Sequence, residues 1–455
     1  MCRRIGLVAA VATVLGLIAP SSPANSGPRA PRSPDQVLNQ LVRQADKAGA
    51  GERHAAVLQN FKLVGHSSLD GFGDYGDVFA HGDFAYVGSR CGDARQGGDG
   101  VQVVIIRNPA QPAVVSTLPN PPFTRAEDVT VLAIDTPAFT GDLAVVGIQA
   151  CFGSGHEAEV VPGLRFYDVT HPAHPSLIGH WDLPQGTIGC HEIDAVQRAD
   201  GMVLAGCARN LIDHFNSNGQ DSVHIVDATD PAHPVTLTDW TLGADPFGGV
   251  GCLPVQFAHS IRFEDGGSSA YVSNWDAGTV HLDITDASNP VVVSDTVIIP
   301  PDEDGDNHSM TLANSGRWLV INPEDFSPGD CPGESSFGGW GEVYVYDNSD
   351  PANPSFLGTF STPNSRSTRD DGAYTDHNTE AVGDDQFFSS WYSDGIVWWT
   401  MDDEGVSNQL GQFVPPGPGG VAFVWGVHPV RGRSLVLASD ITTGLWIVRP
   451  QGFRF

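Results

Sequence analysis

Short stretches in which apolar and polar residues alternate recur along most of the chain, separated by turns rich in Asp, Gly and Pro. One such line, GLRFYDVTHPAHPSLIGHW, begins at Gly163. Related lines begin at Ser222, Thr279 and Glu342, and a more diverged copy begins at Gly100. Each predicts a β-strand, a turn of the form D-x-x-x-P-x-x-P, and a second strand rich in Val, Leu and Thr. Repetition of this kind indicates one supersecondary unit stacked many times.

A hairpin of two further apolar strands goes with each repeat line. The seven hairpins begin at Gly76, Glu127, His191, Ala258, His308, His377 and Trp425. Hairpin and repeat line together give four antiparallel strands in roughly 50 to 70 residues, which is the size of a propeller blade. We therefore predict an all-β fold, a seven-bladed β-propeller of four-stranded antiparallel blades.

The ends of the repeat array suggest how the ring is completed. The last blade, which ends in LWIVRPQGFRF, has three predicted strands, and the segment LQNFKLVGHSSL at residues 58–69 has no blade of its own. We expect this N-terminal strand to complete the last blade, because a closed ring leaves no open end. The propeller domain then covers residues 58–455. Residues 31–57 form a lead-in segment, in which helix-like spacing at 34–47 predicts a partly helical or a disordered stretch.

The first 30 residues have the composition of a targeting segment. Two arginines are followed by an apolar stretch at residues 5–19 and by small residues and prolines at 20–30. This order predicts a signal peptide that is cleaved, and the apolar stretch is too short to span a bilayer. We therefore expect a secreted, extracellular protein with no membrane span.

The charge and the cysteine content indicate which partners and which cellular compartment the protein can have. A formal net charge of −31 argues against nucleic acid as a partner. Besides Cys2, the chain has six cysteines: Cys91, Cys151, Cys190, Cys207, Cys252 and Cys331. An even number suggests disulfides in an exported protein. Cys190 and Cys207 flank one hairpin, and Cys91 and Cys151 stand at similar points in consecutive repeats, which leaves Cys252 with Cys331. Free thiols or a thiolate metal site are the alternatives, although no C-x-x-C occurs.

The repeat line resembles that of the LVIVD-repeat family of secreted bacterial β-propellers. The family line is a Tyr-Val strand, an Asp-x-x-x-Gly turn, an L-x-I-x-D strand and then D-P-x-x-P. It stands here as AYVSNWDAGTVHLDITDASNP from Ala270 and as LVLASDITTGLWIV from Leu435. The first copy has Ile105 in place of the turn aspartate, and the copy at Gly395 lacks the prolines. The resemblance covers residues 58–455 and implies the fold and export, but no particular reaction.

Aligning the seven hairpins on their first apolar pair reveals a candidate site. The residue before this pair is polar in five consecutive blades, in the order Glu127, His191, His259, His308 and His377. The innermost strands of a propeller all start at the same face, so equivalent positions form a ring around one opening of the channel. Four imidazoles and a carboxylate there would suit one divalent transition metal, Zn, Cu, Fe or Mn. The neighbouring carboxylates Glu192, Asp306 and Asp376 would hold the second nitrogen of the rings.

Other interpretations of these residues remain open. A histidine at a fixed repeat position can instead bond to the loop backbone of the next blade. Calcium is less favoured as the metal: the run DEDGDN at residues 302–307 has alternate carboxylates but lacks the Gly and Glu of a calcium loop.

Two classes of function fit these observations. The first is a binding or interaction scaffold, expected to be a monomer, whose partner is an extracellular protein, a glycan or a small molecule. The second is a metal-dependent oxidase or hydrolase with the His/Glu ring as its active site, in which Glu127 or Glu192 would act as the base. A calcium-dependent hydrolase is disfavoured by the histidines.

Overall fold

The computed structural model describes residues 40, 56–69, 73–91, 97–151, 154–209, 223–243, 256–297, 305–326, 340–367, 369, 371–417 and 421–455. The chain has two compact units, Met1–Arg32 and Ser33–Phe455, and every described residue belongs to the second. The predicted signal peptide and most of the lead-in segment lie outside the described residues, as do Cys2, Cys252 and Cys331.

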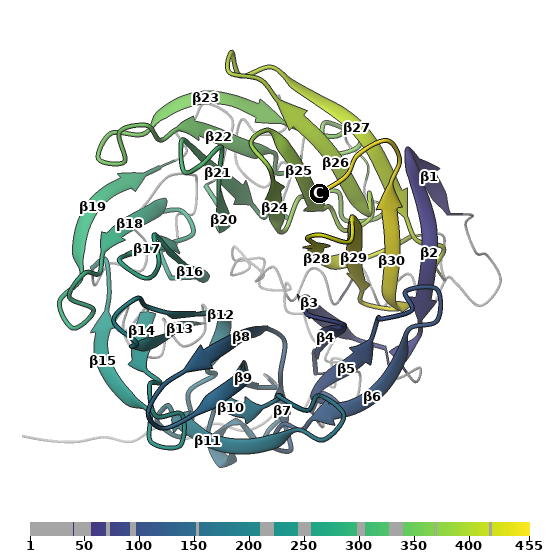
Figure 1. The fold of residues 1–455 in the computed structure, drawn as a ribbon. Helices are drawn as coiled ribbons and strands as arrows, with labels where there is room; N and C mark the ends of the chain where they lie inside the picture. The colour runs from purple at the N-terminus through teal and green to yellow at the C-terminus, as the bar shows by residue number, and fades with distance from the viewer. Residues whose placement is uncertain are drawn as a thin grey trace, which may run out of the picture. The chain divides into compact units, whose positions relative to one another are not determined.

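The described strands form seven antiparallel sheets, which follow one another in a ring (Figure 1). The predicted seven-bladed β-propeller is therefore confirmed. The innermost strands are β3 (Tyr75–His81), β8 (Val129–Asp135), β12 (Cys190–Gln197), β16 (Ser260–Glu264), β20 (Asn307–Ala313), β24 (Thr379–Val382) and β28 (Val424–Val430). The second strands are β4 (Phe84–Ser89), β9 (Thr140–Ala150), β13 (Val203–Arg209), β17 (Ser269–Ser273), β21 (Trp318–Pro323), β25 (Gln386–Ser390) and β29 (Leu435–Asp440).

The repeat lines supply the two outer strands of each blade. The third strands are β5 (Val101–Ile105), β10 (Gly163–Asp168), β14 (Val223–Asp227), β18 (Thr279–Asp283), β22 (Val343–Asp347), β26 (Ile396–Met401) and β30 (Gly444–Pro450). The outermost strands are β6 (Ala113–Leu118), β11 (Ser176–Asp182), β15 (Val235–Trp240), β19 (Val291–Thr296), β23 (Ser355–Phe360), β27 (Ser407–Val414) and β2 (Phe61–Ser67). The short strand β7 (Thr124–Arg125) lies beside β9, and a 3-10 helix, η2, spans Glu157–Glu159.

The segment at residues 58–69 forms parts of two blades. Asn60 has a positive φ of 55° and divides the segment into β1 (Val57–Gln59) and β2. β1 pairs with β27 of the sixth blade, and β2 pairs with β30 of the seventh. The seventh sheet therefore has the order β2-β30-β29-β28, with its outermost strand taken from the N-terminal side.

The aspartate of the repeat line forms the turn between the third and fourth strands. The Oδ1 atoms of Asp168, Asp227, Asp283 and Asp347 each accept the backbone N–H two residues further on, at 2.9 Å. Such a turn, made by an Asp side chain with its own backbone, reverses the chain without a glycine. This is the physical reason why the aspartate recurs at the end of the third strand.

The core lies between neighbouring blades. For example, Phe166 of the second blade packs in one cluster with Ile193 and Val203 of the third, and all three are buried. Packing between neighbouring blades thus covers both faces of the second and third strands, which are buried along most of their length. Within the described residues, no helix is long and apolar enough to cross a membrane.

Two of the predicted disulfides are present. Cys91 is bonded to Cys151 and joins the first and second blades, while Cys190 is bonded to Cys207 within the third. Both lie where inner strands begin or second strands end, beside the ring position described next.

Candidate metal centre

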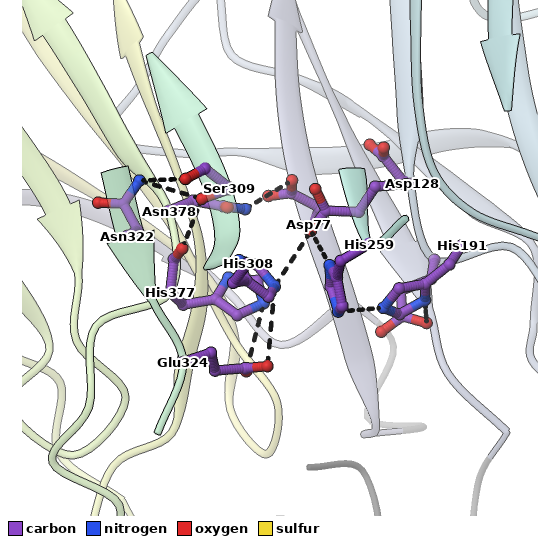
Figure 2. Close-up of polar contacts among 12 residues, drawn as sticks. Asp77, Asp128, His191, His259, His308, Ser309, Asn322, Glu324, His377 and Asn378 are labelled. Atoms are coloured by element: carbon purple, nitrogen blue, oxygen red, sulfur yellow. Dashed lines mark hydrogen bonds and ion pairs between the residues drawn. The ribbon is translucent and has the colours of Figure 1, made fainter. Parts of the chain in front are cut away.

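The four histidines of the aligned position lie together where the inner strands begin (Figure 2). The ladder between the first two strands is irregular at this point, with register shifts between Cys190 and Ile193 and between Asn307 and Ser309. A β-bulge changes the direction in which a side chain projects. His191 lies within the first of these shifts and His308 within the second.

The imidazoles follow one another around the ring. Ring centroids are 4.4 Å apart for His191 and His259, 4.0 Å for His259 and His308, and 4.1 Å for His308 and His377. The Nε2 atoms of His191 and His259 are 3.0 Å apart. Trp425 occupies the same position in the seventh blade, and its ring centroid lies 4.4 Å from that of His377. The sequence alignment of the hairpins therefore placed these side chains correctly beside one another.

Two glutamates lie against the imidazoles. Glu192 Oε1 is 3.3 Å from His308 Nε2 and 3.9 Å from His259 Nδ1. Glu324 lies on the side of the rings away from Asp77 and Asp128 (Figure 2). Its carboxylate oxygens are 3.8 Å from His308 Nε2 and 3.9 Å from His377 Nε2. Tyr392 donates a hydrogen bond to Glu324 Oε1, which fixes this carboxylate.

Within the described residues, two sets of side chains have donor atoms close enough to share a metal ion. One is Glu192, His259 and His308, and the other is His308, Glu324 and His377. Two ligands of a tetrahedral zinc ion lie roughly 3.3–3.6 Å apart, given metal–ligand distances of about 2.0–2.2 Å. The Glu192–His308 contact matches this spacing, and the contacts of 3.8–3.9 Å would have to shorten by a few tenths of an ångström.

Glu127, expected to be a ligand, has other partners. Its carboxylate lies 2.9 Å from Arg125 Nε, 3.7 Å from His191 Nδ1 and 3.8 Å from Arg90 Nε. Gly76 holds the ring position in the first blade, and a Cβ atom there would lie only 3.0 Å from Glu127 Cγ. Glu127 therefore occupies the space left by the glycine and belongs to a buried ion-pair group with the two arginines.

His191 is oriented by the same group. Its Nδ1 atom lies 3.2 Å from Gln149 Oε1 and 3.4 Å from Arg125 Nη2. The Arg125 guanidinium can only donate and therefore needs an unprotonated Nδ1, whereas Gln149 Oε1 accepts from a protonated one. In the Nδ1–H tautomer the Nε2 lone pair of His191 faces His259, and a metal ligand is commonly held through its second ring nitrogen in this way.

The three remaining expected carboxylates have different places. Glu192 reaches the rings directly, so it is a candidate ligand and not only a support for one. Asp306 contributes through its backbone, because its carbonyl oxygen accepts the N–H of Glu324 at 2.9 Å. Asp376 precedes His377 and is fully buried. Of the predicted calcium run, residues 302–304 lie outside the described residues.

Three of the ring histidines lie in buried surroundings that favour the neutral imidazole. Burial lowers the pKa of His259, His308 and His377 well below the usual value of 6.5, and neighbouring imidazoles lower it further. A backbone contact from the next blade partly opposes this effect on each ring. Neither nitrogen of His308 or His377 has a hydrogen bond of normal geometry. Neutral imidazole is the form that binds metals, and buried polar atoms without partners usually indicate a missing one.

The pKa of Glu192, whose carboxylate lies beside these rings, is shifted upward instead. Burial raises the pKa of Glu192 well above its usual value, and the nearby Asp128 and Asp77 carboxylates raise it further. A cation at the rings would reverse this effect, because it stabilises the ionised carboxylate.

Sequence reasoning missed Glu324. This residue follows β21 (Trp318–Pro323), the second strand of the fifth blade. In an antiparallel hairpin, the end of the second strand lies beside the start of the first. In each blade, both therefore lie at the same opening of the central channel. Aligning the ends of the second strands, as was done for the starts of the first, would have brought Glu324 beside His308. The same signal would have identified Arg90, which follows β4.

No family model matches the chain, and no curated protein matches it. Among solved structures, a putative 6-phosphogluconolactonase from Bacteroides uniformis is similar with 12% identity and a TM-score of 0.48, covering 76% of this chain and 90% of that one. The β-propeller domain of Cps50 (Swd1) from Myceliophthora thermophila is similar with 12% identity and a TM-score of 0.48, covering 83% and 97%.

Proposed function

We propose that this chain is a secreted binding propeller of the LVIVD-repeat type whose inner-strand histidines hold one divalent transition metal. The observation that carries the proposal is the pair His308 and His377, two fully buried imidazoles whose ring nitrogens make no hydrogen bond of normal geometry. An imidazole in such surroundings loses its interactions with water, and the contacts with Glu192 and with the backbone of the next blade replace them only in part. A metal ion would supply that missing interaction.

The donor set favours a borderline transition metal. Imidazole nitrogens with one or two carboxylates suit Zn, Cu, Fe or Mn, whereas calcium prefers oxygen ligands alone. His308 belongs to both candidate sets and would be the central ligand. Glu192 would complete the set with His259, and Glu324 would complete the set with His377.

The test is the metal content of the purified, untagged protein, measured by mass spectrometry without added metals or chelators. We expect about one equivalent in the wild type and at least a tenfold loss in His308→Ala. Glu192→Gln and Glu324→Gln show which of the two sets binds the metal. The variant that replaces a metal ligand loses metal, and the other keeps it. His281→Gln is the control, since His281 is a buried histidine outside the ring that stacks on Tyr271. A metal-free wild type after reconstitution, or full metal in His308→Ala, contradicts the proposal.

A catalytic role is the second candidate, and one observation favours it. The Glu192 side chain is 16% exposed, against 3% for Glu324, so the set with His259 has access to solvent. When bound there, a metal would supply Lewis acidity and activate a water molecule for an oxidase or hydrolase reaction. Turnover of ester, phosphoester or thiol substrates by the metal-loaded wild type, lost together with the metal in Glu192→Gln and kept in Glu324→Gln, would support this role. Equal turnover in the wild type and in metal-free Glu192→Gln contradicts it.

A further inference from the structure

A groove lies between the outer strands of the fourth and fifth blades, and none of its described lining residues belongs to the histidine ring. It has a volume of about 850 Å³ and is lined by residues of β19, β22 and β23 and of the turn before β23. This volume lies within the range of small-molecule sites. Three aromatic side chains, Tyr344, Tyr346 and Phe356, form its apolar part.

The aromatic part is exposed in an unusual way. Phe356 is 59% exposed, while Tyr344 and Tyr346 beneath it are almost fully buried. The Phe356 ring centroid lies 6.3 Å from that of Tyr344 and 5.9 Å from that of Tyr346, so the exposed ring has a firm support. A fixed aromatic ring offers a flat apolar face at little cost in conformational entropy.

The feature belongs to the fifth blade and is not a property of the repeat. Two residues after the proline that precedes the outermost strand, the second, third and fourth blades have Leu177, Thr236 and Val292. The fifth blade has Phe356 at this position. The repeat architecture therefore does not require an aromatic residue here.

The polar part of the groove combines the hydroxyls of Ser294, Thr296 and Thr359 with three further polar groups. Asp295 and Glu342 contribute carboxylates, and Asn353 contributes an amide whose nitrogen donates to Asp350 Oδ2 at 2.9 Å, which leaves its oxygen as an acceptor. Among the described residues that line the groove there is no Lys, Arg or His, although Arg366 lies 3.5 Å from Glu342. Such a lining repels anions and suits a ligand with many hydroxyl or amine donors.

We propose that this groove binds a neutral or amine-bearing oligosaccharide. The C–H face of a sugar ring would lie on Phe356, and its hydroxyl or amine groups would donate to Asp295, Glu342 and Asn353. A proline-rich peptide, the other common ligand of aromatic grooves, has few N–H donors and would supply few hydrogen bonds to Asp295 and Asn353. The inference is independent of the metal proposal, because the two sites share no residue.

The test is isothermal titration calorimetry of the full chain with cellohexaose, a neutral probe, and with chitosan hexamer, an amine-bearing probe. We expect at least one of them to bind, with affinity about tenfold or more weaker in Phe356→Ala and also weaker in Asp295→Asn. Leu177→Ala is the matched control, since Leu177 is the exposed residue at the same position of the second blade.

The outcomes separate this site from the metal site. Sugar binding that persists in His308→Ala supports a separate groove. The proposal is overturned if neither probe binds at millimolar concentration, if Phe356→Ala binds as well as the wild type, or if a proline-rich decapeptide binds and the sugars do not. Because Phe356 is largely exposed, its replacement is not expected to affect folding, and circular dichroism of the variant checks this.

Discussion

Two polar regions lie on the same inner strands, and they differ in how well their groups are satisfied. At the start of the strands, His308 and His377 are buried with no hydrogen bond of normal geometry to either ring nitrogen. Further along, Arg262 of β16 reaches across the fifth blade to Glu380 of β24, with Nη2 2.8 Å from Oε1. Its Nη1 also donates to the carbonyl of Met310 at 3.2 Å.

This difference separates a structural role from a ligand-binding role. The Arg262–Glu380 pair ties the fourth, fifth and sixth blades together and needs nothing more from outside the chain. The histidines lose their hydrogen bonds to water on burial and do not regain them all within the chain. Proteins tolerate such groups mainly where they perform a function. The two regions should therefore respond differently to mutation, to pH and to metal.

The largest effect is expected from breaking the ion pair. Glu380→Ala leaves the Arg262 guanidinium without its partner, which should lower the free energy of unfolding by about 1–3 kcal/mol. This is less than for a fully buried pair, because the Arg262 side chain is 34% exposed. Urea unfolding of metal-free protein measures the loss. The double variant Arg262→Met with Glu380→Gln should lose less than the sum of the single variants, and simple additivity would show that the pair is not coupled.

A smaller effect is expected from acidification. Burial, aided by Arg262 and Arg431, lowers the pKa of His428 to about 4 against the opposing effect of Glu380. The unfolded chain, with a histidine pKa of about 6.5, then binds more protons than the folded one between these values. The contribution of His428 is fully present above pH 6.5 and is lost as the pH falls towards 4. This loss should be about 1–2 kcal/mol, because His428 is only partly buried by area.

Chemical denaturation at pH 4, 5, 6 and 7 measures this loss. His428→Gln should show a flatter pH dependence than the wild type. An identical dependence in both proteins would place the acid sensitivity elsewhere, with the ring histidines as the first alternative.

The smallest effect is expected from replacing a ring histidine in metal-free protein. His308→Gln should change the free energy of unfolding by about 1 kcal/mol or less, because no normal hydrogen bond is lost. With a metal at 100 times its dissociation constant, the wild type should gain about 2.7 kcal/mol and the variant none. Thermal unfolding with and without zinc compares the two. A large loss in metal-free His308→Gln would mean that the histidines are as structural as the ion pair.

Much of the fold could be read directly from the repeats. The D-x-x-x-P line marks the third and fourth strands because its aspartate caps the turn with its own side chain. The bonded pairs Cys91–Cys151 and Cys190–Cys207 also followed from their places in the repeats, whereas Cys252 and Cys331 lie outside the described residues. That His191, His259, His308 and His377 lie together was predictable too, because equivalent positions in a ring face the same opening.

Only the tertiary structure decided which partner each of these side chains takes. Glu127 stands at the ring position, yet it pairs with Arg125 and Arg90, and the second of these comes from another blade. Glu192 reaches His308 two blades away, and Glu324 reaches the rings from the end of a second strand. Periodicity along the chain fixes where a residue stands around the ring. The choice among competing partners depends on distances of a few ångströms between blades, and these are set by how the blades pack against one another.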